Sequence, residues 1–127
     1  MTQANVYQPG VCNIGPAEIR RRRSAGYIGL AVTVVFLVVA FAFGWASPWR
    51  LFVVLPAAMS ASGFLQARLH FCARFGARGL FNFGALGSEE AVHEAEYRRK
   101  DQRKAVLILV LSAAIGIVVA LIAVLIP

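Results

Sequence analysis

The lysine and arginine residues of this chain are sorted around three long apolar stretches, residues 27–46, 51–67 and 105–126. Four arginines precede the first stretch and eight basic residues lie between the second and the third, with Arg50 as the exception. If each stretch crosses a membrane, both basic regions lie on the same side. Because cytoplasmic loops collect lysine and arginine, that side is the cytoplasm. The pattern predicts a three-span protein of the bacterial inner (plasma) membrane, with its N-terminus inside and its C-terminus outside.

Composition agrees with a membrane location. Hydrophobic residues make up 59% of the 127 residues, and the mean hydropathy is +0.68. These values are too apolar for an ordinary soluble domain. The net charge of +7 would suggest a nucleic-acid partner in a soluble protein. Here it is better explained by topology and by attraction to anionic lipid headgroups, so we expect membrane lipids as partners and no nucleic acid.

The lengths of the apolar stretches fit helices that span a bilayer, which need roughly 20 residues. The second stretch is shorter and contains Pro56, which removes a backbone donor and predicts a kink. Arg50 and Arg68 bracket it and can reach opposite interfaces. The turn at residues 46–48 is so short that the first two helices should form an antiparallel hairpin. We expect an all-α fold in a single membrane domain that covers residues 1–127.

The remaining segments are predicted to be cytoplasmic. Residues 1–15 are expected to form a tail, and a helix should begin near Pro16 and continue through the arginine run into the first span. Residues 70–84, rich in phenylalanine and glycine, should lie in the inner interface with their rings toward lipid, or tuck against the helices. Ser88 is a candidate N-cap, which predicts one long helix from about residue 88 through the third span. Within the segment 68–104 and the first helix, the expected headgroup contacts are Arg20, Arg21, Arg22, Arg23, Arg74 and Arg78.

Small residues recur at every fourth position on the second and third spans. On a transmembrane helix this spacing lets two backbones approach closely. The pattern is explained either by packing within the chain or by association with a second copy or a partner subunit. The candidate packing residues are Ala57, Ala61, Ser112, Gly116 and Ala120.

The sequence contains few residues suited to catalysis. We find no metalloprotease, phosphate-loop, dinucleotide or nucleophile motif and no carboxylate inside a span, which argues against an enzyme and a transporter. Cys12, His70 and Cys72 should lie near the inner interface, where they could bind a soft metal ion if the second helix ends by Phe71. On a continuing helix, Arg68 would instead share a face with Cys72 and favour its thiolate. The alternative is that both cysteines pack as small hydrophobic residues.

Two short motifs resemble a known family. Asn13-Ile14-Gly15 is followed by Glu18 and the run Arg20–Arg23, and the second span is followed by Cys72-Ala73-Arg74-Phe75-Gly76. Together they resemble the small two-helix membrane domain of YgaP-type membrane rhodaneses, which also occurs as short bacterial membrane proteins. The resemblance implies a helix hairpin, often dimeric and sometimes attached to a sulfurtransferase domain, with Cys72 as the position carried over. This chain differs in having Ala73 where the family has proline after the cysteine, in lacking a rhodanese domain and in adding a third span.

These observations favour a small, non-enzymatic accessory or structural subunit that packs with itself or with a larger membrane complex. One alternative is a cytoplasm-facing thiol or metal site, centred on Cys72, for sulfur or redox handling. Another is a small transporter subunit.

Overall fold

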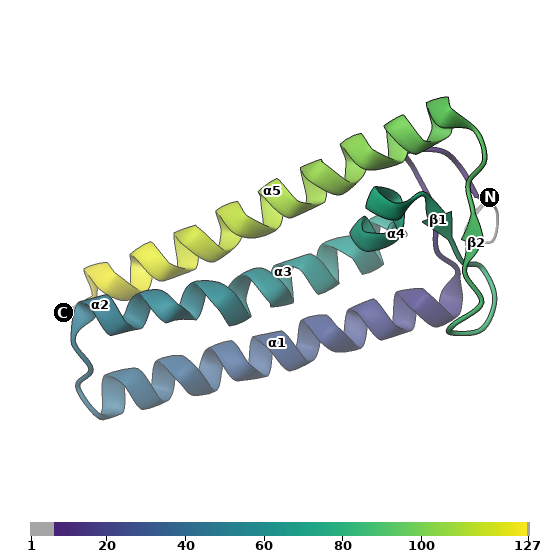
Figure 1. The fold of residues 1–127 in the computed structure, drawn as a ribbon. Coiled ribbons are helices and arrows are strands. Elements are labelled where there is room, and N and C mark those ends of the chain that lie inside the picture. Colours follow the sequence, from purple (N-terminus) through teal and green to yellow (C-terminus); the bar gives the residue numbers. More distant parts are fainter. Residues whose placement is uncertain (1–6, 127) are drawn as a thin grey trace.

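The computed structural model describes residues 7–126, and the protein is mostly helical (72%). In chain order the elements are α1 (Pro16–Ala42), α2 (Ser47–Arg50), the 3-10 turn η1 (Leu51–Val53), α3 (Val54–Leu69), α4 (Ala73–Arg78), β1 (Leu80–Phe81), β2 (Glu90–Ala91) and α5 (Ala95–Leu125) (Figure 1). Within the described residues, three helical segments are long and apolar enough to cross a membrane: Pro16–Ala42, Ser47–Leu69 and Ala95–Leu125. The prediction of three such helices is confirmed.

The first helix begins where the sequence predicts. Pro16 occupies the start of α1, where its missing N–H costs no helical hydrogen bond, and Glu18 lies in the first turn. The helix ends at Ala42, and Gly44 follows with a φ of 64°, a left-handed conformation that favours glycine. The chain then turns into α2, so α1 and the helical segment that begins at Ser47 are joined by a short connection.

The helix winding tightens just before Pro56, and the kink predicted there stays a prediction. Pro56 is the third residue of α3, and the preceding turn, η1, is a 3-10 helix. The proline ring opposes the carbonyl group four residues earlier, which is that of Phe52 in η1. The helical segment from Ser47 to Leu69 therefore changes its winding just before the proline.

The three long helices form one layer with α3 between α1 and α5 (Figure 1). Glycines permit the close approach: a Cβ on Gly63 would lie 2.6 Å from the backbone nitrogen of Gly26, and one on Gly116 would lie 2.9 Å from the carbonyl oxygen of Val54. Ser60 Oγ donates a hydrogen bond of 2.8 Å to the carbonyl oxygen of Gly26. Because a single layer cannot cover its own faces, large apolar side chains remain exposed along all three helices.

At one end of the layer, residues 7–15 and 70–94 form a compact unit that we call the headpiece (Figure 1). Its two strands are antiparallel, with Leu80 paired to Ala91 and Phe81 to Glu90. This small sheet was not predicted by the all-α assignment. Phe71 and Phe75 are fully buried beneath the helices, so these two rings pack inside the protein and the expectation that they face lipid is wrong.

The start of the last helix also differs from the prediction. α5 begins at Ala95, with Glu94 at the N-cap position, and not near residue 88. The segment before it is drawn into the headpiece instead, because β2 pairs with β1 and the N–H of Val92 donates to the carbonyl oxygen of Gly79 at 2.7 Å. Tertiary pairing outweighs the local helix signals at Ser88. The part of α5 before residue 105 still extends the helix beyond the apolar stretch 105–126.

The N-terminal segment is held against α5. Tyr7 Oη donates a hydrogen bond of 2.6 Å to Asp101 Oδ2, and the N–H of Gly10 donates one of 2.7 Å to Asp101 Oδ1. The predicted tail is therefore attached to the protein from Tyr7 onward. The part of that prediction that concerns residues 1–6 lies outside the described residues.

Candidate functional site

A buried polar cluster joins the headpiece to α1, and Asn13 is its centre. The side-chain oxygen of Asn13 accepts a hydrogen bond of 2.7 Å from the N–H of Cys72, and its amide nitrogen donates one of 3.2 Å to the carbonyl oxygen of Cys72. Both residues are buried, at 0% and 1% exposure. The amide side chain thus imitates a strand partner for residue 72 and satisfies two backbone groups that water cannot reach.

Asn82 extends the cluster from the other side. Its N–H donates to the carbonyl oxygen of Asn13, and the N–H of Gly15 donates to the carbonyl oxygen of Asn82, both at 2.9 Å. The Asn82 side chain donates to Glu18 Oε2 at 3.1 Å and to the carbonyl oxygen of Ala85 at 2.9 Å. Asn13 and Asn82 therefore join three segments that are distant in sequence: the N-terminal segment with the start of α1, the chain at Cys72, and the chain around Asn82.

Glu18, Arg22 and Cys72 form a charged edge of this cluster. Arg22 Nη2 lies 3.3 Å from Glu18 Oε1 and donates a hydrogen bond of 2.8 Å to Cys72 Sγ. The Glu18 side chain is 1% exposed and that of Arg22 12%. The guanidinium also lies over the ring of Phe75, 5.7 Å from its centroid. Removing one member of a buried ion pair leaves an uncompensated buried charge and destabilises the fold. This ion pair therefore stabilises the position of α1 against the headpiece.

A second polar contact lies where α5 enters the headpiece. Burial raises the pKa of the Asp101 carboxyl above its ordinary value, and the hydrogen bonds from Tyr7 and Gly10 oppose this shift. Burial and the bond to Asp101 raise the pKa of Tyr7, so its hydroxyl stays protonated and remains a donor. Asp101 is the one acid within residues 98–104, a run that is otherwise basic except for Gln102.

The residues predicted to bind a metal, Cys12, His70 and Cys72, all lie in the headpiece. α3 ends at Leu69 and His70 takes the left-handed conformation, so the condition set for metal binding is met. However, across residues 7–126 there is no group of three or more His, Cys, Asp or Glu side chains placed to hold a metal ion. Cys12 is buried, and burial raises the pKa of its thiol. Cys72 is buried beneath Asn13 and Arg22.

The same helix end corrects the expected partner of Cys72. Because the left-handed His70 breaks the helix, Arg68 and Cys72 do not share a helix face. The guanidinium that contacts the sulfur comes from Arg22 on α1. Arg22 therefore also differs from the other arginines expected at headgroups. Those that remain exposed are Arg20, Arg21, Arg23, Arg74 and Arg78.

The small residues predicted to pack lie between helices of this chain or line a groove along α3. Gly116 faces Ala58 and Val54, while Ser112 and Ala120 are buried on the same side of α5. Ala57 is buried on α3, and Ala61 is partly exposed and lies one turn further along.

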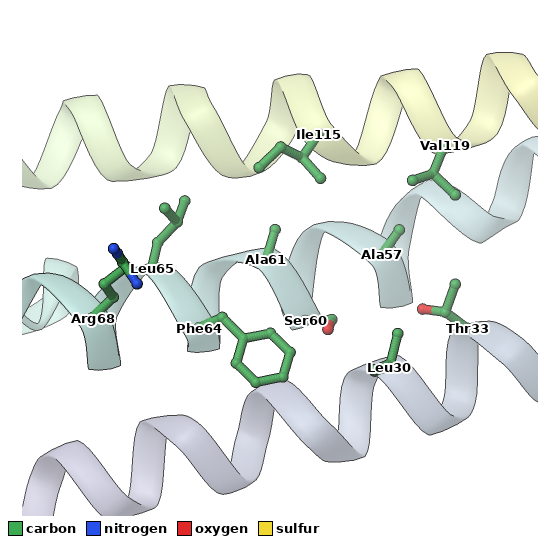
Figure 2. A pocket seen from close by; sticks show the side chains of 10 residues that line it. All are labelled: Leu30, Thr33, Ala57, Ser60, Ala61, Phe64, Leu65, Arg68, Ile115 and Val119. Carbon is green, nitrogen blue, oxygen red and sulfur yellow. The ribbon is translucent and has the colours of Figure 1, made fainter.

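That groove runs along α3 between the two flanking helices and has a volume of about 380 Å³. Figure 2 shows Leu30 and Thr33 on the α1 side, Ile115 and Val119 on the α5 side, and Arg68 at one end. Its size is typical of pockets for apolar ligands.

The other end of the layer is closed by Arg50, which sequence reasoning placed at the membrane interface. The residue is 8% exposed. Its Nη1 donates to the carbonyl oxygens of Ala123 and Ile126, at 3.2 and 2.7 Å, and its guanidinium lies 4.4 Å from the ring centroid of Phe41. Arg50 thus satisfies carbonyl groups at the C-terminal end of α5 that have no helical partner.

The cluster residues were missed because their partners are distant in sequence. Asn13 and Glu18 were noted in motifs, but nothing local indicates that Asn13 faces Cys72 or that Glu18 faces Asn82. The second polar contact did have a local signal, because Asp101 is an isolated acid among basic residues.

The fold and the cluster define a class: a mostly helical protein with three membrane-length apolar helices and a small polar headpiece. Comparisons with protein-family models, with curated proteins and with solved structures found no match. The resemblance to the membrane domain of YgaP-type rhodaneses therefore stays a prediction.

Proposed function

We propose that this is a multi-pass inner-membrane protein in which α1 and α3 form an antiparallel transmembrane hairpin, α5 is the third span and the headpiece lies in the cytoplasm. The exposed apolar side chains on the long helices support this, since a soluble protein rarely exposes so large an apolar surface. Exposed arginines lie at the headpiece end, and Trp45 and Trp49 lie near the opposite end, where aromatic rings suit an interface.

Reporter fusions test this topology. A reporter that works only in the cytoplasm should be active when it is joined after Gly87. A reporter that works only outside the cytoplasm should be active when it is joined after Pro127. A reporter that gives the opposite location at either point would contradict the three-span arrangement.

We further propose that the protein acts as a non-enzymatic accessory or scaffold subunit that associates with itself or with a larger membrane complex. The observation that carries this proposal is the uncovered face of α3 opposite the groove, where Leu55 and Met59 are 62% and 69% exposed. Two residues along a helix turn it by about 200°, so Met59 lies away from Ala57 and the groove. The polar cluster makes its hydrogen bonds within the fold, and the burial of Cys72 favours a structural role over thiol chemistry.

Site-directed photocrosslinking in native membranes tests this association. A photoreactive residue in place of Met59 should crosslink to a second protein chain, of the same kind or another. The control is the same residue in place of Ile108, which is fully buried and should give no crosslink between chains. If Met59 crosslinks to nothing but lipid, the uncovered face is a lipid-facing surface and the scaffold proposal is wrong.

A further inference from the structure

The groove along α3 is apolar for its whole length and ends at a charge. The two hydroxyl groups that line it are turned inward, since Thr33 Oγ1 donates to the carbonyl oxygen of Gly29 at 2.7 Å and Ser60 Oγ donates to that of Gly26. The groove therefore presents hydrocarbon. Among its lining residues within the described chain, Arg68 alone carries a charge, and it lies at the headpiece end (Figure 2).

The guanidinium of Arg68 is available to a ligand. Arg68 is exposed, and within residues 7–126 no hydrogen bond or ion pair joins it to another side chain. Arg23 on α1 is also exposed, and within the same residues it makes no hydrogen bond or ion pair with another side chain. Arg23 precedes Leu30 by seven residues, or two helical turns, so both lie on one face of α1. The contacts of Gly26 with Gly63 and of Gly29 with Ser60 place Arg23 and Arg68 at similar heights along the layer.

From this arrangement we propose that the groove binds an anionic phospholipid of the inner leaflet, with an acyl chain along α3 and the phosphate between Arg68 and Arg23. Guanidinium groups suit phosphate because they donate two hydrogen bonds in a fixed geometry. The inference rests on the proposed membrane insertion, and it assigns a ligand to a face distinct from that of Met59.

Charge distinguishes this lipid from a second copy of the chain as the occupant. A second copy with the same orientation in the membrane would bring its own basic inner end to Arg68, where arginines and lysines would repel one another. An anionic headgroup offers the complementary charge at that height, and its acyl chain matches the hydrocarbon lining.

Native mass spectrometry of the full chain in detergent tests the site. The protein is mixed with equal amounts of phosphatidylglycerol and phosphatidylcholine that carry the same acyl chains, and the ratio of the bound lipids is measured. The wild-type chain should retain phosphatidylglycerol preferentially. Arg68→Gln should reduce that preference about tenfold, because it removes a charge-assisted contact with phosphate. Arg99→Gln is the matched control. Arg99 is an exposed arginine on α5, also near the headpiece end of the layer, and its replacement should leave the preference unchanged.

A second pair of variants tests the acyl-chain part of the proposal. Ala61→Phe fills the groove and should abolish retention of both lipids, whereas Met59→Phe adds the same ring on the opposite face and should not. The proposal is overturned if Arg68→Gln keeps the wild-type ratio, if Ala61→Phe still retains phosphatidylglycerol, or if soluble glycerol phosphate displaces the lipid completely. It is also overturned if a second copy of the chain occupies the groove, which would appear as a dimer lost on Ala61→Phe.

Membrane insertion is measured separately. If alkaline carbonate releases the wild-type chain from membranes, the proposed function fails whatever the lipid ratio is. If the chain stays in the membrane but shows no preference for phosphatidylglycerol, the lipid site alone fails.

Discussion

Replacing Asn13 with alanine should open the headpiece around Cys72. The asparagine side chain makes two hydrogen bonds to the backbone of residue 72, of 2.7 and 3.2 Å, and both partners are buried. Each backbone group left without a partner costs about 1–3 kcal/mol. Because the opened loop can admit some water, we expect Asn13→Ala to lower the free energy of headpiece opening by roughly 2–4 kcal/mol for the two hydrogen bonds together.

The thiol of Cys72 reports this opening directly. In the folded protein the residue is 1% exposed, so a maleimide should reach it only when the headpiece opens. A loss of roughly 2–4 kcal/mol increases the open population about 30- to 700-fold, and the labelling rate should rise by the same factor while opening is faster than the reaction. Peptide mass spectrometry separates the labelling of Cys72 from that of Cys12.

Gln8→Ala is the matched control, because it also removes a headpiece amide, but one whose side chain makes no hydrogen bond in the described structure. Its effect on Cys72 labelling should be small. If Asn13→Ala labels no faster than Gln8→Ala, Asn13 does not hold residue 72 and the proposed organisation of the headpiece is refuted.

Three further changes test other contacts by thermal or denaturant unfolding in detergent. Gly63→Ala should lower the melting temperature, because the new Cβ would lie 2.6 Å from the nitrogen of Gly26 and force α1 away from α3. Arg50→Met should lower the free energy of unfolding by about 2 kcal/mol or more, because it removes charged hydrogen bonds to the end of α5. Arg78→Met, at an exposed arginine, should leave the free energy of unfolding nearly unchanged. Asp101→Asn should flatten the pH dependence of stability. The folded pKa of Asp101 is raised, so in the window from its ordinary value near 4 up to the folded value the native state binds more protons, and this contribution to stability falls as pH rises.

Each of these has an outcome that contradicts it. An unchanged melting temperature for Gly63→Ala would mean that the two backbones are not in contact. Equal effects of the Arg50 and Arg78 variants would remove Arg50 from the end of α5. A stability of the wild-type protein that rises with pH across the window named for Asp101, by an amount that Asp101→Asn abolishes, would reverse the direction of its pKa shift.

The long helices could be predicted from the sequence because their signals are local. Twenty or so consecutive apolar residues specify a membrane-length helix whatever surrounds them, and Pro16 marks the start of α1 through its own covalent geometry. The prediction failed where local and distant signals compete. Ser88 and the acids after it favour a helix start, yet Glu90 and Ala91 pair with β1 and the N–H of Val92 donates to the carbonyl oxygen of Gly79, partners that lie outside the local sequence.

The cluster at the headpiece shows most clearly what sequence alone leaves open. Arg20, Arg21, Arg22 and Arg23 are chemically identical neighbours, and their sequence positions predict the same role for all four. The pitch of α1 directs Arg22 toward Glu18, four residues earlier, and the return of the chain after α3 brings Cys72 to the same place. The remaining three stay exposed. The sequence by itself determined the three long apolar helices, because their apolar character and helix signals depend on nearest neighbours. Tertiary structure decided which polar groups are buried together, because a buried hydrogen bond needs a partner that only the folded chain can place beside it.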